Sequence, residues 1–184
     1  MTEYIPEMKK LYIEKVVPGL KEALGISNIY ALPKISKIVI NAGLGASQEK
    51  AGLLEQAMRD LTLLAGQRPI FTLAHKSIAG FKIRTGMQIG AKVTLRGNRM
   101  YDFLSRFLNI AVPRMRDFRG FMDKSIDGRG NFSFGITEHN IFPEVALADK
   151  EQPFSMQVTI VINAKDKEQG KLLLEKFGFP FVKE

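Results

Sequence analysis

The chain of 184 residues contains no cysteine and only two histidines. The absence of cysteine excludes disulfide bonds and thiolate metal sites. Neither His75 nor His139 lies at metal-ligand spacing from a second ligand, so we expect no bound metal and no other cofactor. No uncharged apolar run approaches the roughly 18 residues that a membrane span requires.

The first residues, "MTEYIPEMKK", also lack the basic region followed by an apolar region that a signal peptide needs. We therefore expect a cytoplasmic protein without a membrane partner. The length and an ordinary composition favour a single domain over residues 1–184, with an N-terminal helical segment within 1–25. We expect the free protein to be a monomer.

Acidic residues are scarce in the middle of the chain. Residues 68–134 contain 13 Lys and Arg against four acids, a net charge of +9, whereas all other residues contain 14 against 15. A solvated basic surface would explain a bias of two or three charges, but a block of this size favours a polyanionic partner. A membrane surface is disfavoured, because these cations lie on expected strands and loops rather than on one amphipathic helix.

Hydrophobic periodicity predicts an alternation of helices and strands. A first helix is expected at 7–24, with Pro18 kinking or splitting it and Gly25 ending it. Further helices are expected from Ser47 as a cap to Gly66, at 98–112 and at 166–177, and strands at 34–45, 69–74, 88–97, 131–138 and 156–164. The stretch 114–130 is typical of a long basic loop. Because strands 69–74 and 88–97 follow one another without a helix, we expect an α+β fold with a largely antiparallel sheet and helices on one face.

Three of the expected strands alternate between aliphatic and polar side chains, which indicates an aliphatic face towards the helices and an open polar face. Their aliphatic members are Ile38, Ile40 and Ala42, then Ile89, Ala91, Val93 and Leu95, then Val158, Ile160 and Ile162. Opposite them lie Lys37, Val39 and Asn41, then Gln88, Lys92, Thr94 and Arg96, then Gln157, Thr159 and Asn163. The open face carries almost no aromatic residue on which single-stranded RNA could stack, so its amides, hydroxyls and cations favour folded RNA.

Motifs for enzymatic chemistry are weak. Gly43 and Gly45 are spaced as in a dinucleotide-binding turn, but position 48 is Gln48 instead of glycine, and no P-loop lysine motif is present. The segment from Asp123 is similar to a calcium loop, but Phe134 occupies the position of the bidentate glutamate. We expect no catalytic residue. Two alternatives stay open: a phosphate- or nucleotide-handling enzyme built on the glycine turn, and a generic single-stranded RNA binder.

Four segments, in the same order along the chain, carry a resemblance to one family. They are "KSIAGFKIR" (76–84), "GAKVTLRG" (90–97), "RDFRG" (116–120) and "DGRGNF" (127–132). At these segments, and collinearly from about residue 8 to "FGFPF" (177–181), the sequence resembles large-subunit ribosomal protein five, the family that binds 5S ribosomal RNA. The resemblance implies an antiparallel sheet with helices on one side. It also implies a non-enzymatic constituent of the large ribosomal subunit that anchors 5S rRNA in the central protuberance.

The resemblance further implies site residues and partners. The positions that match the family's 5S rRNA contacts are Asn41, Gln67 and Thr94, and we expect Lys37, Lys92 and Arg96 to add phosphate contacts. The other implied partners are 23S rRNA, the tRNA in the peptidyl site and, across an intersubunit bridge, small-subunit ribosomal protein thirteen. The candidates for 23S rRNA or intersubunit contact are Arg114, Arg116, Arg119 and Arg129.

The residues 74–87 form a loop that is longer than ordinary hairpin connections and contains no acid. Gly80 and Gly86 allow bends, and we expect an arm that is mobile when free and ordered against RNA. The resemblance implies that this RNA is the elbow of peptidyl-site tRNA, contacted by Lys76, Ser77, Gly80, Phe81, Lys82 and Arg84. Two features depart from the family: His75 stands where a second Lys or Arg is usual, and 144–155 lacks the usual charge pattern.

Overall fold

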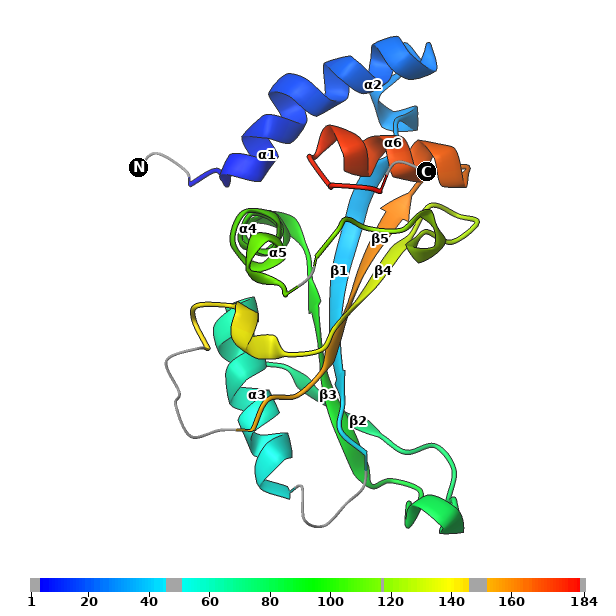
Figure 1. Ribbon diagram of the computed structural model, residues 1–184. Helices are drawn as coiled ribbons and strands as arrows, with labels where there is room; N and C mark the ends of the chain where they lie inside the picture. Colours follow the sequence, from blue (N-terminus) through cyan, green and yellow to red (C-terminus); the bar gives the residue numbers. More distant parts are fainter. Residues whose placement is uncertain (1–3, 46–50, 117, 146–151, 183–184) are drawn as a thin grey trace. The chain divides into compact units, whose positions relative to one another are not determined.

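The computed structural model describes residues 4–45, 51–116, 118–145 and 152–182 (Figure 1). The chain divides into two compact units. The first consists of residues 1–38, 95–134 and 159–184, and the second of residues 39–94 and 135–158. The boundaries between the units fall within four of the strands.

The sheet has five strands in the order β2-β3-β1-β5-β4. They are β1 (Lys34–Gly43), β2 (Ile70–Leu73), β3 (Gln88–Leu95), β4 (Phe132–Ile136) and β5 (Met156–Asn163). Each coincides with a predicted strand and is slightly shorter where the prediction ran into flanking turn residues. β2 and β3 are antiparallel, and the predicted α+β class with a largely antiparallel sheet is confirmed.

Two helices of the first unit each contain a π-helical turn just before a proline. The N-terminal helix runs as α1 (Glu7–Leu11), a π-helical turn at Tyr12–Val16, and α2 (Val17–Leu24), which ends at Gly25 with φ of 64°. Proline has no N–H to donate, and its ring crowds the carbonyl four residues earlier, so the wider turn just before Pro18 accommodates it. We expected Pro18 to kink or split the helix; the helical turns instead continue without a break from Glu7 to Leu24, with the wider turn before Pro18.

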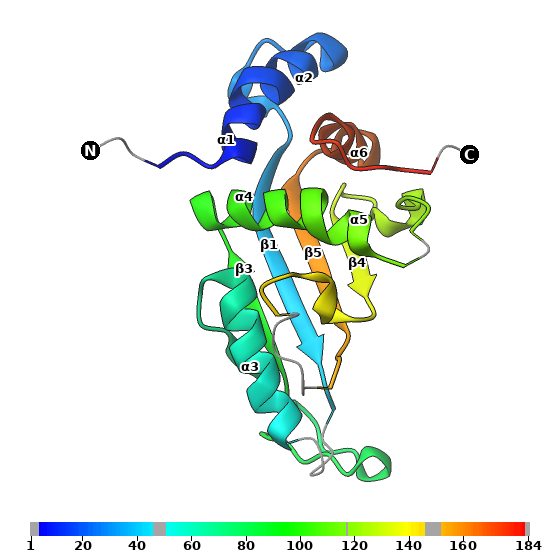
Figure 2. The same ribbon diagram turned by 60° about the vertical axis from the view of Figure 1, so that its left-hand side comes forward.

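The second helix of this unit repeats the arrangement. It runs as α4 (Gly97–Arg106), a π-helical turn at Phe107–Ala111, and α5 (Val112–Arg114), which contains Pro113. Figure 2 shows α4 crossing the face of the strands of its own unit. Along α4 and its continuation, apolar side chains at helical spacing are buried, namely Tyr101, Leu104, Phe107 and Leu108.

Phe121 lies at the centre of an aromatic cluster in the first unit. Its backbone N donates to the carbonyl oxygen of Pro180 (2.7 Å), and Val182 N donates to the carbonyl oxygen of Phe121 (3.0 Å). The basic loop is thereby joined to the segment that follows α6 (Lys167–Lys176). The rings that lie within 6.3 Å of the Phe121 ring, between centroids, belong to Phe107, Phe118, Phe132, Phe134, Phe179 and Phe181. Phe118 of "RDFRG" and both Phe179 and Phe181 of "FGFPF" therefore belong to this packed cluster.

The loop before β4 packs against α6 through two glycines. A Cβ atom on Gly170 would lie only 2.5 Å from the Cα and carbonyl oxygen of Gly130. Within the loop, Asp127 accepts hydrogen bonds from the backbone N of Arg129 (2.9 Å) and of Asn131 (2.8 Å). The side-chain amide of Asn131 donates to the same carboxylate, and this bond is the main cause that holds the pKa of Asp127 below its ordinary value. These contacts fix the loop with Arg129 exposed.

In the second unit, α3 (Ala51–Ala65) lies along one face of the strands (Figures 1 and 2). Its buried residues include Ala57, Leu61 and Leu64, as the helical spacing predicts. The helix is followed by Gly66, whose φ of 59° is the left-handed conformation that terminates many helices. The predicted cap, Ser47, lies outside the described residues.

Candidate nucleic-acid interface

The central strands separate into an aliphatic face and a polar face. In β1, Ile38, Ile40 and Ala42 have no exposed surface, whereas Lys37 and Asn41 are partly exposed. β3 and β5 show the same alternation: Lys92 and Gln157 are exposed, while Thr94 and Thr159 are half-buried. The division predicted from the period of two is confirmed.

Tertiary structure connects the three residues that match the family's 5S rRNA contacts, and all three lie in the second unit. β1 and β3 are neighbours in the sheet, so Asn41 and Thr94 lie on adjacent strands. Gln67 follows α3, and its Nε2 donates a hydrogen bond to the carbonyl oxygen of Thr94 at 3.3 Å. Lys92 lies two positions before Thr94 on the same face. These four residues therefore bring two amides, a hydroxyl and a cation into one region of the second unit.

Lys37 and Arg96 lie in the first unit. Lys37 continues the polar face of β1, and Arg96 continues that of β3. Arg96 has extended backbone (φ −140°, ψ 165°) at the position where α4 begins, and its side chain is exposed. Both cations are available to solvent within their own unit.

The strand register adds two residues that the sequence analysis did not single out. Ile70 lies opposite Lys92 and Thr72 lies opposite Gly90 in the antiparallel pair, so both side chains point to the polar face. Ile70 is 59% exposed. Gly90 cannot carry a side chain, because a Cβ atom there would lie 2.3 Å from the carbonyl oxygen of Ala42. Only the pairing register identifies these residues, since a strand isoleucine or threonine carries no chemical signal of its own.

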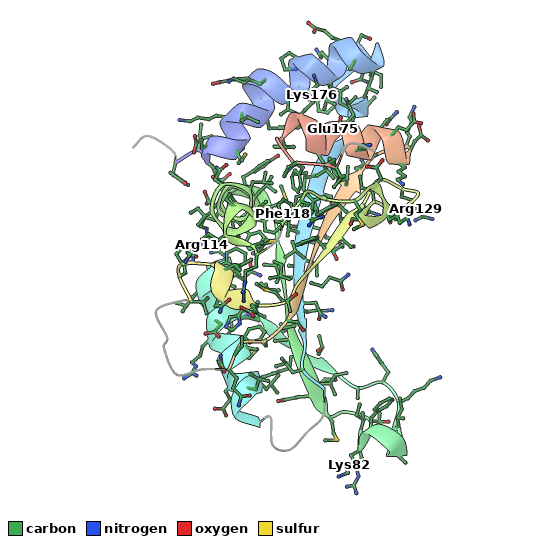
Figure 3. All side chains as sticks on the ribbon, in the orientation of Figure 1. Lys82, Arg114, Phe118, Arg129, Glu175 and Lys176 are labelled. Atoms are coloured by element: carbon green, nitrogen blue, oxygen red, sulfur yellow. The ribbon has the colours of Figure 1, made fainter. Side chains whose placement is uncertain are left out.

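The loop 74–87, called the arm below, is held together by its own hydrogen bonds. At its base, Ala74 N donates to Met87 O and Gly86 N donates to Ala74 O, both at 2.9 Å. Near its tip, Ile78 N donates to Ile83 O (2.9 Å) and Ile83 N donates to Ile78 O (3.1 Å). Figure 3 shows Lys82 at the far end of the arm, beyond the strands that carry it.

The chemistry of the arm is cationic and apolar. The side chains of Lys76, Lys82 and Arg84 are exposed, and so is His75. Phe81 is 73% exposed and Ile78 is 47% exposed. These exposed side chains give the arm a surface that is cationic and apolar, while its projection as a separate arm and its mobility in the free protein stay predictions.

The four arginines predicted to contact 23S rRNA or the small subunit do not form one patch. All four lie in the first unit and all are exposed: Arg114, Arg116, Arg119 and Arg129. Figure 3 shows Arg114 at the end of α5 and Arg129 on the loop before β4, well apart within that unit. They can serve more than one contact.

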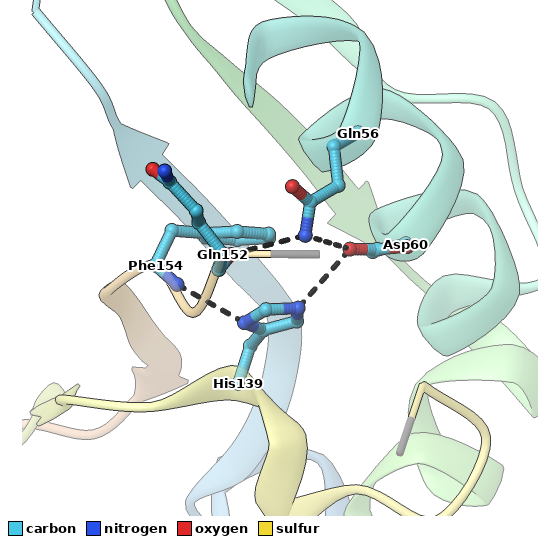
Figure 4. Close-up of polar contacts among 5 residues, drawn as sticks. All are labelled: Gln56, Asp60, His139, Gln152 and Phe154. Carbon is cyan, nitrogen blue, oxygen red and sulfur yellow. Dashed lines mark hydrogen bonds and ion pairs between the residues drawn. The ribbon is translucent and has the colours of Figure 1, made fainter. Parts of the chain in front are cut away.

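A buried polar cluster in the second unit was not predicted (Figure 4). His139 and Asp60 are each 3% exposed, and His139 Nε2 lies 3.1 Å from Asp60 Oδ2. Because His139 Nδ1 accepts a hydrogen bond from Phe154 N (3.2 Å), Nε2 carries the proton and donates to the carboxylate. Gln56 Nε2 donates to Asp60 Oδ2 (3.4 Å) and to the carbonyl oxygen of Gln152 (3.0 Å). The cluster joins α3 to the segment around Phe154, and its burial makes it a structural feature.

The structure of the described residues does not support the alternatives that involve a bound ion or a bound nucleotide. Across the part of the chain that the structure describes, no three acidic or histidine side chains are placed to hold a metal ion. Asp123, the first residue of the calcium-like segment, instead binds Lys171 Nζ at 2.6 Å. In the glycine turn, Gly45 has a φ of 75°, and Gln48 lies outside the described residues. Within the described ranges, no helix is long and apolar enough to cross a membrane.

Comparison with known proteins identifies the family. Residues 28–84 match the family model described as ribosomal protein L5, and residues 88–181 match the model that describes the C-terminus of the same ribosomal protein family. Large ribosomal subunit protein uL5 of Psychrobacter cryohalolentis and that of Desulforapulum autotrophicum are each 51% identical over 174 residues, which cover 95% of this chain and 98% and 97% of theirs. The uL5 of Fusobacterium nucleatum is 48% identical over 183 residues, 100% of both chains.

These similarities extend over nearly the whole chain and agree with the four quoted segments. They confirm that the protein is not an enzyme, and they place it on the ribosome in the cytoplasm. Association with ribosomal RNA follows from the same membership. The chain belongs to the ribosomal protein L5 family and is a structural constituent of the large ribosomal subunit.

Proposed function

We propose that the protein binds 5S rRNA through the polar face of its second unit and anchors that RNA in the central protuberance. The observation that carries the proposal is the grouping of Asn41, Thr94 and Gln67, with the Gln67 amide bonded to the backbone of Thr94. Amides and hydroxyls both donate and accept hydrogen bonds. They therefore suit the ribose hydroxyls and base edges that a folded RNA displays in its shallow minor groove.

The experiment that tests this function identifies which RNA the protein retains from a mixture of cellular RNAs. Purified protein is incubated with a total RNA extract, and the retained RNA is identified by sequencing. We expect 5S rRNA as the retained species. Retention of poly-U in preference to folded 5S rRNA would favour a generic single-stranded RNA binder instead.

Lys37, Lys92 and Arg96 are proposed as phosphate contacts of the same RNA. Replacing Lys92 or Arg96 by alanine is expected to reduce the slope of log affinity against log salt by roughly one unit, because each phosphate contact releases about one counterion. The measurement is a 5S rRNA titration at several salt concentrations. Thr62→Ala, at an exposed position on α3 away from the polar face, is the control and should leave the slope unchanged. An unaltered slope in Lys92→Ala would exclude that phosphate contact.

The arm is proposed to contact the elbow of peptidyl-site tRNA, and the exposed arginines to contact 23S rRNA or small-subunit ribosomal protein thirteen. The arm carries three exposed cations and no acid, as a surface for a polyanion should. The arginines concerned are Arg114, Arg116, Arg119 and Arg129. The separation of Arg114 from Arg129 within the first unit supports two contacts rather than one.

Deleting residues 77–83 is expected to separate the two RNA sites. The deletion leaves the base of the arm and the polar face intact, so affinity for 5S rRNA should stay within about twofold, as for distant independent sites. Release of peptidyl-site tRNA from ribosomes that contain the variant should become faster. The two measurements are a 5S rRNA titration and a tRNA dissociation rate. Loss of 5S rRNA binding in the deletion variant would contradict the proposal that the polar face and the arm bind different RNAs.

A further inference from the structure

We infer that the arm meets RNA through an apolar apex, formed by Ile78 and Phe81, which packs on the flat face of an unstacked base. Behind this apex, Ser77 and Thr85 act as positioning residues. The inference rests on the RNA role proposed for the arm and adds to it the chemical group that the arm contacts and the residues that shape it.

The apex is an apolar surface presented in one defined conformation. A short 3-10 turn at Ala79–Phe81 lies between the paired backbones of Ile78 and Ile83. Lys82 follows it with φ of 53°, the only non-glycine residue of the described chain with a positive φ. This left-handed conformation is unfavourable for a lysine and persists only where the surrounding structure enforces it. The turn thereby holds the Phe81 ring 73% exposed.

The charges around the apex favour RNA as its occupant. Lys76, Lys82 and Arg84 are exposed on the same short arm, and the arm contains no acid to pair with them. A polyanion that also displays flat apolar rings satisfies both features at once, and RNA with an unstacked base is such a ligand. Stacking on an aromatic ring is tolerant of sequence, so the apex would recognise an accessible base rather than a particular one.

The hydroxyl of Ser77 is used within the arm. Thr85 N donates to Ser77 Oγ at 3.0 Å, and the two hydroxyl oxygens lie 3.1 Å apart. This pair, together with the Ile78–Ile83 backbone bonds, ties the two sides of the arm eight residues apart in sequence. The resemblance implies that Ser77 contacts tRNA, whereas the geometry assigns it to the shape of the arm. These bonds limit the conformations that the free arm can adopt, and they thereby lower the entropy cost of ordering it against RNA.

The apex is tested with the full-length protein and one fluorescently labelled tRNA transcript. Phe81→Ala is expected to reduce affinity roughly tenfold, in the range for loss of one stacked base, with the salt slope unchanged. Phe81→Tyr keeps a flat ring and should bind like the wild type. Lys82→Gln is the charge control and should lower the salt slope by about one unit. Chemical probing of the tRNA should show one base that the wild type protects and Phe81→Ala leaves reactive.

The positioning role has its own readout. Ser77→Ala is expected to weaken tRNA binding several-fold, and Ser77→Thr, which keeps the hydroxyl, should restore it. Hydrogen exchange at the amides of Ile78 and Ile83 should become faster in the free Ser77→Ala protein, because the arm opens more often. Ser77→Ala with unchanged exchange and unchanged affinity would overturn the positioning role.

The binding measurements distinguish a failure of the apolar apex from a failure of the tRNA role proposed for the arm. If the wild type binds tRNA no more tightly than the variant that lacks 77–83, both the tRNA role of the arm and the role of the apex are wrong. If the wild type binds more tightly than that variant but Phe81→Ala binds as tightly as the wild type, the arm acts through its cations alone. In that case only the role of the apex is wrong.

Discussion

Replacing Asn41, Gln67 and Thr94 together by alanine is expected to reduce affinity for 5S rRNA by roughly a hundredfold or more, close to abolishing it. Each side chain offers hydrogen-bonding groups worth about 0.5–1.5 kcal/mol net, and the RNA groups left unpaired add to the loss. The three residues lie in one region of the second unit, so their effects should be coupled rather than simply additive. The measurement is a titration with labelled 5S rRNA.

A control is available in the same unit, away from the polar face. Thr62 is exposed on α3 and belongs to none of the implied 5S rRNA contacts, so Thr62→Ala should bind normally. The circular dichroism spectrum of the triple variant should keep its helical signal, because the three side chains lie outside the buried core. A folded triple variant with unchanged affinity would refute the assignment of the 5S rRNA site.

Replacing His139 by alanine is expected to lower the free energy of unfolding by about 3–5 kcal/mol, a large part of the stability of a typical domain. The change leaves the buried carboxylate of Asp60 with Gln56 as its remaining donor in the cluster, and it removes the acceptor of Phe154 N. It also removes the imidazole that stacks on the Phe154 ring at 3.8 Å. Urea denaturation followed by circular dichroism measures the loss.

Two further variants identify the cause. Asn140→Ala alters an exposed neighbour and should leave stability almost unchanged. The double variant Asp60→Leu with His139→Leu removes the buried charge along with its partner and should cost less than the sum of the single changes. A loss of less than about 1 kcal/mol in His139→Ala would show that the buried pair contributes little.

The polar face could be predicted because alternation in a strand depends on local geometry alone. The side chains of β1, β3 and β5 point alternately to the two faces whatever the order of the strands. An effect of Pro18 on its helix could be predicted for the same reason, since it follows from the missing N–H and the ring. The widening by a π-helical turn, repeated at Pro113, was not predicted, because propensity does not distinguish it from a kink.

The pairings between distant segments could not be predicted. Asp60 and His139 are separated by 79 positions, and nothing near either residue indicates the other. The contribution of Ile70 and Thr72 to the polar face depends on the register of β2 against β3, which a sequence without a tight hairpin turn leaves open. The internal use of Ser77 depends on the path of the arm, which composition does not describe.

Local periodicity and charge were enough to assign the helices and strands, the polar face and the basic central block. The four quoted segments carried the resemblance to the ribosomal L5 family, which the comparisons then showed. Which polar groups meet could be read from the folded chain alone: Gln67 contacts the backbone of Thr94, Asp60 contacts His139, and Ser77 contacts Thr85. Such contacts join residues that are apart in sequence, and their energy is realised only when packing brings both partners out of water.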